Sequence, residues 1–149
     1  MLEIFVDGDA CPVKAEVLRV ARRHGLPVHL VSNRPLWGES DPLLHRQIVG
    51  DGADAADDWI ALHIGAGDVA VTADIPLAAR CLARGAQALS PTGKPFTADA
   101  IGMALAMRDL NAHLRETGVI TGSNPAFTRQ DRSRFLQALE QAIQTARRR

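Results

Sequence analysis

The chain has few cysteines, few aromatic residues and no excess of either charge, and each scarcity excludes a class of protein. Two cysteines among 149 residues are too few for a disulfide framework. The 17 basic and 17 acidic side chains cancel, which excludes a uniformly basic coat for nucleic acid. Aromatic residues make up 4% of the chain and tyrosine is absent, so we expect no platform of stacked aromatic rings for single strands. The 5 histidines show no H-E-x-x-H pairing, and we interpret them as structural or exposed.

The chain also lacks a long apolar run and a basic, signal-like start. No run reaches the roughly 18 apolar residues needed to span a membrane. The first residues, Met1 to Ile4, lead directly into a strand-like segment. We therefore expect a reduced, cytoplasmic protein without membrane contacts, and its protein partners and oligomeric state stay open. The length favours one domain over residues 1–149, with a flexible basic tail at Arg147 to Arg149.

What the chain does have is a regular alternation of two kinds of apolar segment. Short, continuously apolar runs predict strands at residues 2–6, 27–32, 47–49, 68–72 and 86–89. Helical spacing of apolar residues predicts helices at residues 12–24, 53–64, 75–84, 98–114 and after residue 130. Buried strands that alternate with helices form parallel sheets. The prediction is an α/β, three-layer sandwich with a mainly parallel central sheet, in which ligands bind beyond the carboxyl ends of the strands.

Aspartates outnumber glutamates 12 to 5, and many of them follow the predicted strands. The groups are Asp7 and Asp9 after the first strand, Asp51, Asp54, Asp57 and Asp58 around the start of the second helix, and Asp74 after the fourth strand. All three groups fall at the same edge of the predicted sheet. Carboxylates that converge repel one another unless a cation balances them. Mg²⁺ or Mn²⁺, which prefer oxygen ligands, meet that need, and we expect Thr72 to support the site by hydrogen bonding.

Several of these residues also have a second interpretation. Asp9, Asp54 and Asp74 are each candidates for the N-cap of a helix, a purely structural role. We favour the metal site because three separate groups meet at one edge. Cys11 stands at the predicted start of a helix, which lowers a thiol pKa, so a nucleophilic cysteine is a further alternative. The aspartates beside it oppose a thiolate, and Cys81 is expected in the core.

A basic segment opens the last predicted helix. Arg129, Arg132 and Arg134 lie there among small hydroxyl residues, an arrangement that binds phosphate. Lys94, in a loop of glycine and proline, is a further candidate for phosphate binding. Beside an acidic metal site, these cations would hold the backbone of a nucleic acid. The alternative is a helix cap, because Thr128 is followed three residues later by an aspartate, with the arginines solvated.

Four segments of the chain resemble the bacterial YaiI/YqxD family, which is regarded as PIN-like. They are residues 4–13 (IFVDGDACPV), 52–60 (GADAADDWI), 71–78 (VTADIPLA) and 131–136 (DRSRFL), and together they span nearly the whole chain. The resemblance implies a PIN-like, Rossmann-like fold and the activity typical of PIN-like domains, which are metal-dependent nucleases that often act on RNA. It places their acids at Asp7, at Asp54 or Asp58, and at Asp74. Gly8 departs from the alanine that the family pattern carries between its two aspartates.

The resulting hypothesis is the hydrolysis of phosphodiesters by a metal-activated water, with RNA favoured over DNA as the substrate. The predicted catalytic acids are Asp7, Asp54, Asp58 and Asp74, and the predicted metal ligands are these four together with Asp9 and Asp57. One alternative is a phosphatase of the haloacid-dehalogenase type, although the paired acids of that family follow its threonine and here precede Thr72. The other is a non-catalytic module that binds RNA or protein, against which the intact acids argue.

Overall fold

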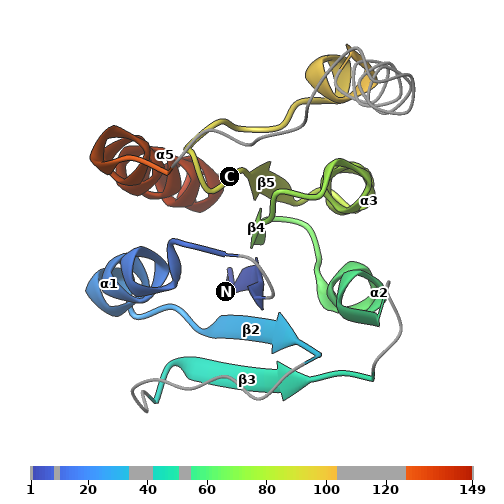
Figure 1. Ribbon diagram of the computed structural model, residues 1–149, viewed down its shortest axis with the longest axis horizontal. Coiled ribbons are helices and arrows are strands. Elements are labelled where there is room, and N and C mark those ends of the chain that lie inside the picture. Colours follow the sequence, from blue (N-terminus) through green and yellow to red (C-terminus); the bar gives the residue numbers. More distant parts are fainter. Residues whose placement is uncertain (1, 9–10, 34–41, 51–54, 104–126, 149) are drawn as a thin grey trace, which may run out of the picture.

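In the residues that the computed structural model describes (2–8, 11–33, 42–50, 55–103 and 127–148), five parallel strands form a single sheet. The strands are β1 (Ile4–Asp7), β2 (Val28–Ser32), β3 (Leu44–Ile48), β4 (Val69–Val71) and β5 (Gln87–Leu89). Their order across the sheet is β3-β2-β1-β4-β5 (Figure 1). Strands β2 and β3 lie on one side of β1, and the chain then crosses over to form β4 and β5 on the other side. The order of the strands therefore reverses between β1 and β4.

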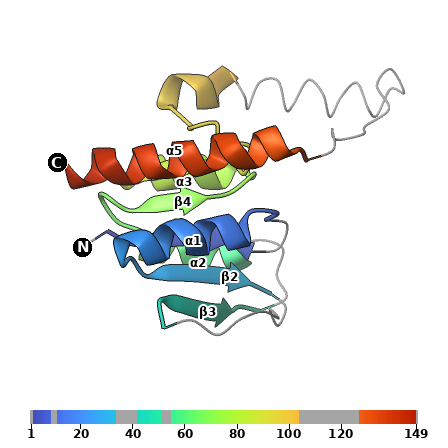
Figure 2. The same cartoon turned by 90° about the vertical axis from the view of Figure 1, so that its left-hand side faces the viewer.

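Helices cover both faces of this sheet and complete the three predicted layers. They are α1 (Lys14–His24), α2 (Ala55–His63), α3 (Ile75–Ala83) and α5 (Arg129–Arg147), and residues 98–103 are also helical. The first and last of these, α1 and α5, lie on one face, and α2 and α3 lie on the other (Figure 1). Figure 2 shows β2, β3 and β4 pointing away from the end of the molecule where α5 finishes. The amino end of α5 thus lies on the side of the sheet's carboxyl edge.

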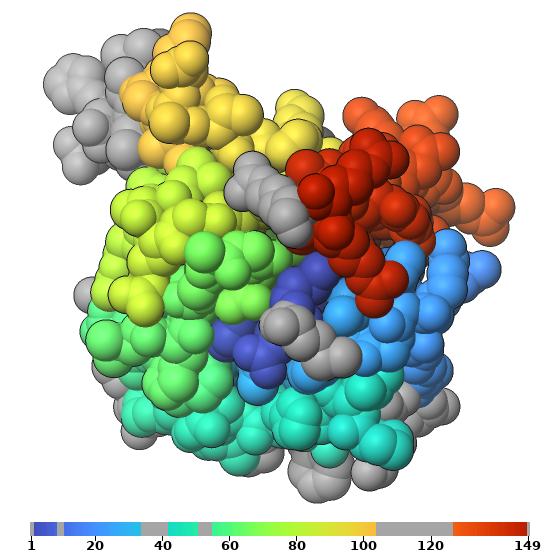
Figure 3. All heavy atoms as spheres, turned by 180° about the vertical axis from the view of Figure 1, so that it is seen from behind, coloured from blue at the N-terminus to red at the C-terminus, as the bar shows by residue number. Residues whose placement is uncertain are grey.

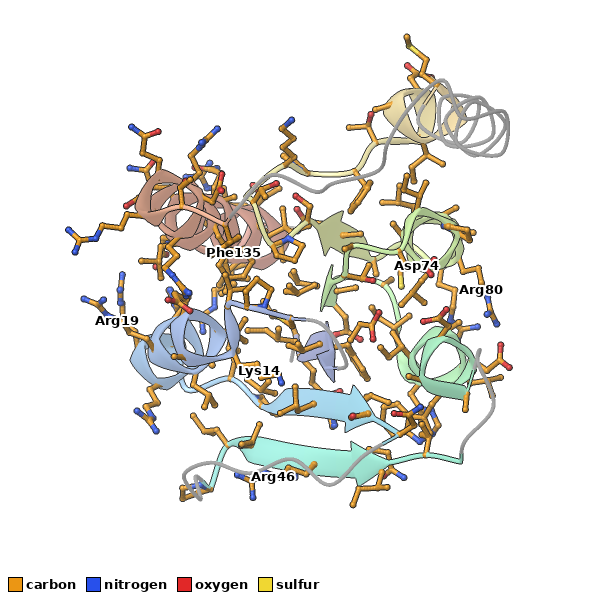
Figure 4. The ribbon with its side chains drawn as sticks, viewed as in Figure 1. Lys14, Arg19, Arg46, Asp74, Arg80 and Phe135 are labelled. Carbon is orange, nitrogen blue, oxygen red and sulfur yellow. The ribbon has the colours of Figure 1, made fainter. Side chains whose placement is uncertain are left out.

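The strands divide their side chains between two hydrophobic cores. In β1, Ile4 and Val6 join the core beneath α1 and α5, while Phe5 joins the core beneath α2 and α3. Phe135 of α5 has 0% exposure and lies between that helix and the sheet (Figure 4). Burying a side chain of this size contributes roughly 1.5–3 kcal/mol to stability. Because both faces are covered, the strands are apolar at successive positions instead of alternating with polar residues.

Local signals fix the ends of the helices. Gly25 ends α1 at a positive φ of 65°, a conformation that glycine adopts without strain. Thr128 and Asp131 form the predicted reciprocal cap at the start of α5: each backbone N–H donates to the other side chain. Gly93 has a φ of 87°, and a Cβ built there would lie 2.6 Å from the backbone carbonyl carbon of Arg134. Only glycine therefore lets the turn after β5 approach α5 this closely.

The predicted elements are confirmed within the described residues, and the differences that matter most lie at the starts of β3 and α5. Strand β3 begins at Leu44, three residues before the predicted start, because it pairs in register with Val28 of β2 although its polar sequence carries no apolar run. Helix α5 begins at Arg129, inside a stretch predicted to be irregular up to residue 130. Arg147 belongs to α5 and donates to the carbonyl of His24 at 3.0 Å, and the flexible tail expected at residues 147–149 stays a prediction.

The helix predicted at residues 98–114 is present over residues 98–103, and its remainder lies outside the described residues. The same is true of Arg149. None of the helices in the described part of the chain has both the length and the hydropathy needed to cross a bilayer.

Candidate active site at the carboxyl edge of the sheet

The site is built where β1 and β4 end side by side. The parallel register pairs Val6 with Val71, so the next residues of the two strands, Asp7 and Thr72, also become neighbours. This is the point at which the strand order reverses, and the helices that follow β1 and β4 leave toward opposite faces of the sheet. In open parallel sheets the resulting crevice beyond the carboxyl ends is the usual place for ligands.

Thr72 connects two of the predicted acids. Its hydroxyl donates to Asp7 Oδ2 at 3.1 Å and accepts the backbone N–H of Asp74 at 2.9 Å. Thr72 is 1% exposed, so both bonds are shielded from competing water. Because this buried hydroxyl both donates and accepts a hydrogen bond, it fixes the Asp7 carboxyl group relative to the backbone of Asp74. The supporting role predicted for Thr72 therefore has a geometric basis.

Asp74 has the structural role that the sequence left as an alternative. Its Oδ1 accepts the backbone N–H of Leu77 at 2.9 Å, which makes Asp74 the N-cap of α3 (Figure 4). Pro76 in the first turn reinforces this helix start. The cap uses one carboxylate oxygen, and a carboxylate has two oxygens with about four acceptor positions. Capping α3 and binding a cation at Asp74 are therefore compatible roles.

The acids of α2 are not gathered at this point. Asp58 pairs at 2.8 Å with Arg80 of α3, which is labelled in Figure 4, and both side chains are about half exposed. Asp57 is half-buried one residue earlier. The described residues contain no group of three or more His, Cys, Asp or Glu side chains placed to hold one metal ion. Asp9 and Asp54, two of the predicted ligands, lie outside the described residues, and so does Asp51. The full ligand set stays a prediction.

The basic residues of α5 divide into two kinds. Arg132 donates to Glu16 Oε1 and to the carbonyl of Pro12, both at 2.9 Å, and its guanidinium lies 4.8 Å from the centre of the Phe127 ring. These contacts tie the start of α5 to the start of α1. Arg129 and Arg134, by contrast, line an open surface cavity of about 460 Å³.

Lys94 resembles Arg129 and Arg134, because it also lies at the surface beside the start of α5. It is exposed in the turn that Gly93 brings against α5. The pKa of Asp131 is lowered chiefly by the backbone N–H of Thr128 and, to a smaller extent, by the charges of Arg134 and Lys94. The start of α5 therefore carries several cations near one another, although Arg134 also pairs with Asp131 at 3.2 Å.

Neither cysteine has the environment of a nucleophile. Burial raises the pKa of the Cys11 thiol, and this effect exceeds the lowering by the backbone of Val13 and by Lys14. Burial likewise raises the pKa of the Cys81 thiol to about 11. A thiol reacts as the thiolate, so both cysteines are poor nucleophiles at neutral pH. The alternative of a nucleophilic Cys11 is therefore not supported.

Sequence reasoning missed a group of ring-bearing residues on the face beneath α2. Phe5, His29 and His45 occupy neighbouring positions on three adjacent strands, and their rings stack. Trp59 and His63 of α2 approach the same place and stack on each other. Phe5, His29 and His45 are separated by 24 and 16 positions in the chain, so no local motif shows them. The pairing register of three strands is the signal that finds them.

Comparison with known proteins gives one consistent result. Residues 5–145 match the family described as uncharacterized BCR, YaiI/YqxD family. The UPF0178 protein of Rhodospirillum rubrum is 58% identical over 99% of both chains. Those of Parvibaculum lavamentivorans and Mesorhizobium japonicum are each 57% identical, over 100% and 96% of this chain and 98% and 92% of the relative. No solved structure matches the chain.

Proposed function

The chain belongs to the YaiI/YqxD family, and from the geometry of its carboxyl edge we propose that it is a divalent-metal-dependent phosphodiester hydrolase that acts on RNA. The observation that carries the proposal is the arrangement around Thr72. One buried hydroxyl bonds to Asp7 and to the backbone of Asp74, at the point where the strand order reverses.

The residues at this point fit Mg²⁺ or Mn²⁺. Such ions take oxygen ligands, keep several waters and are often held by only one or two carboxylates. Asp7 and Asp74 supply two carboxylates next to one hydroxyl. In the proposal, these two residues hold the ion, and Asp9 and Asp54, which lie outside the described residues, are the further predicted ligands. The predicted ligands Asp57 and Asp58 on α2 are left out of the proposed site, and Asp58 pairs with Arg80.

Each described residue has a separate task in the proposed reaction. A divalent ion, when bound, supplies the positive charge that favours hydroxide over water and offsets the charge of the phosphate. Thr72 donates to Oδ2 of Asp7 and thereby holds that carboxyl group at the edge of the sheet. Asp74 is held through its own backbone N–H and through the first turn of α3, so its carboxyl group needs little reorganisation to bind a ligand.

In the proposal, the cations that bind the phosphates of the substrate lie at the start of α5. Arg129, Arg134 and Ser133 line the open cavity there, and Lys94 stands close by in the turn after β5. The amino end of α5 lies on the side of the sheet's carboxyl edge (Figure 2), as do Asp7 and Asp74. A strand that crosses from the acids to this helix would keep its phosphates near positive charge. Arg132 is excluded from this role in the proposal, because Glu16 and Pro12 occupy its guanidinium.

The direct test measures cleavage of single-stranded RNA and DNA with Mn²⁺, Mg²⁺ or EDTA. We expect Mn²⁺- or Mg²⁺-dependent cleavage of RNA, loss of this activity in EDTA, and a fall of about 100-fold or more in Asp7→Asn. Asp99→Asn is the matched control, because Asp99 is an exposed aspartate outside the site. Circular dichroism establishes that both variants fold. Cleavage that persists in Asp7→Asn contradicts the proposal, and RNA binding without cleavage in any metal favours the binding module instead.

A further inference from the structure

A row of rings crosses the sheet beneath α2. The register pairs Phe5 with His29 and His29 with His45, so the three side chains project from the same face of adjacent strands. The centres of the first two rings are 4.6 Å apart and those of the second two are 5.3 Å apart, with interplanar angles of 20° and 24°. These distances match the roughly 4.8 Å between neighbouring strands. The pairing of the strands therefore enforces the stack.

Helix α2 adds two more rings above this row. The Trp59 ring lies 6.1 Å from that of Phe5 and 6.0 Å from that of His29. His63 stacks on Trp59 at 3.9 Å and 16°, and its Nδ1 bonds to the Trp59 carbonyl at 2.7 Å. Three of the 5 histidines and one of the 2 tryptophans are thus gathered in one place. The aromatic content of 4% does not reveal this cluster, because it counts only Phe, Trp and Tyr and leaves out the histidine rings, which also stack.

A cavity of about 320 Å³ lies among these rings. Its lining includes Glu3, Phe5, His29, His45, Trp59 and His63. The row ends at His45 on the edge strand, where the ring is exposed, whereas Phe5 at the other end is 2% exposed. Gln47 and Arg46 also contribute to the lining. The volume falls at the lower end of the range for sites that bind small molecules.

Polar groups in the lining distinguish this cavity from a gap in the packing. Glu3 holds the His29 ring through a contact of 3.2 Å, and its side chain is 39% exposed. A carboxylate, an amide and a guanidinium thus lie beside flat π-surfaces. That combination suits a ligand that has a planar heterocycle with hydrogen-bond donors and acceptors. The ligand would also carry a negative charge close to this heterocycle.

We propose that this cavity binds a nucleobase, which stacks on the ring row that ends at His45. The base belongs either to a free nucleotide or to a single strand of RNA. The position favours a link with the site above it: Phe5 and Asp7 lie on the same strand, two residues apart and roughly 7 Å along it. Figure 3 shows the amino edge of the sheet, opposite to the carboxyl edge at which Asp7 lies. The dark-blue amino-terminal residues lie there between the green and light-blue segments. The proposal concerns binding only and does not rest on the metal site.

The test is calorimetric titration of the full chain in EDTA, so that metal binding and cleavage play no part. The probes are AMP, ribose 5-phosphate and a six-nucleotide single-stranded RNA. Ribose 5-phosphate carries the charge and sugar of AMP without the base. We expect AMP or the RNA to bind, and ribose 5-phosphate to bind at least about 5-fold more weakly than AMP where AMP binds. Binding of the RNA alone identifies a strand as the source of the base.

Variants then locate the contact. His45→Ala should weaken binding about 5-fold or more, and His45→Phe should restore it because the ring returns. Leu62→Ala is the control: Leu62 is 70% exposed on α2 and does not line the cavity. Three results overturn the proposal: no binding of AMP or RNA, equal affinity for AMP and ribose 5-phosphate, or binding that His45→Ala leaves unchanged. The comparison of AMP with ribose 5-phosphate uses the unmodified protein and holds even if a variant fails to fold.

Discussion

Thr72 Oγ1 donates to Asp7 Oδ2 across the boundary between β1 and β4, although 65 residues separate the two in the chain. The contact joins the ends of the two strands between which the sheet reverses its order. Because the same oxygen accepts the N–H of Asp74, it also joins β1 to the start of α3. A single buried hydroxyl thus connects the ends of two strands with the cap of a helix. The proposed metal site depends on this connection.

Thr72→Val tests the connection, because valine keeps the shape of threonine and removes the hydroxyl. The Asp74 N–H then loses its acceptor and Asp7 loses a donor. We expect a loss of about 1–3 kcal/mol in the free energy of unfolding. We also expect Mn²⁺ affinity to fall about 10- to 100-fold, as it does when groups behind metal ligands are removed.

Thr72→Ser is the matched control for this substitution, since it retains the hydroxyl. Urea denaturation measures the stability, and a Mn²⁺ titration measures the affinity. If Thr72→Val loses stability but binds Mn²⁺ as the unmodified protein does, the hydroxyl is structural only.

The two kinds of arginine on α5 should respond differently to removal. Arg132→Ala breaks the bonds to Glu16 and Pro12 and leaves the Glu16 side chain, which is 15% exposed, without its counter-charge. We expect a loss of about 1–2 kcal/mol in the free energy of unfolding. Arg129→Ala should leave stability within about 0.5 kcal/mol and weaken RNA binding, with a smaller dependence on salt. Denaturation and filter binding at several salt concentrations separate the two effects. Equal effects of both variants on RNA binding would contradict the assignment.

The contact between α1 and α5 should make stability depend on pH. Glu140 accepts from His24 at 2.8 Å and from Gln144 at 2.9 Å, and these bonds lower the pKa of Glu140. A carboxyl group whose pKa is lower in the folded state stabilises the fold above its unfolded pKa of about 4.3. That contribution disappears as the pH falls through the folded pKa.

We therefore expect Glu140→Gln to be less stable than the unmodified protein at pH 7, with a difference that shrinks toward pH 3. Thermal unfolding across this range measures the difference. Gln141→Ala, at an exposed position of the same helix, is the control. A difference that stays constant from pH 7 to pH 3 would show that the carboxylate charge is not responsible.

Much of the fold follows from local patterns in the sequence. The continuous apolar segments around Val6, Val31 and Val71 predicted buried parallel strands, because strands covered on both faces need no polar positions. The pair Thr128 and Asp131 predicted a helix start, because such a cap depends only on neighbouring residues. The edge strand β3 was located less accurately. It is held by pairing with β2, and its own sequence, LHRQI, lacks an apolar run.

The candidate site was predictable in position but not in detail. The rule that ligands bind at the carboxyl edge placed Asp7, Thr72 and Asp74 together. The position of Asp58 near the start of a helix predicted it at the same edge, but could not foresee its ion pair with Arg80, which lies on another helix. The ring row was not foreseen for a similar reason: His29 and His45 meet only through the register of two strands. Contacts between distant segments depend on packing, which local patterns do not encode.

The most direct test of the central claim is the effect of Mn²⁺ on thermal unfolding of the unmodified protein, Asp7→Asn and Asp99→Asn. An ion that binds only the folded state raises the melting temperature as its concentration increases. We expect Mn²⁺ to raise the melting temperature of the unmodified protein and of Asp99→Asn, and to leave that of Asp7→Asn unchanged. The same shift in all three proteins, or none in any of them, would contradict a metal site at the carboxyl edge.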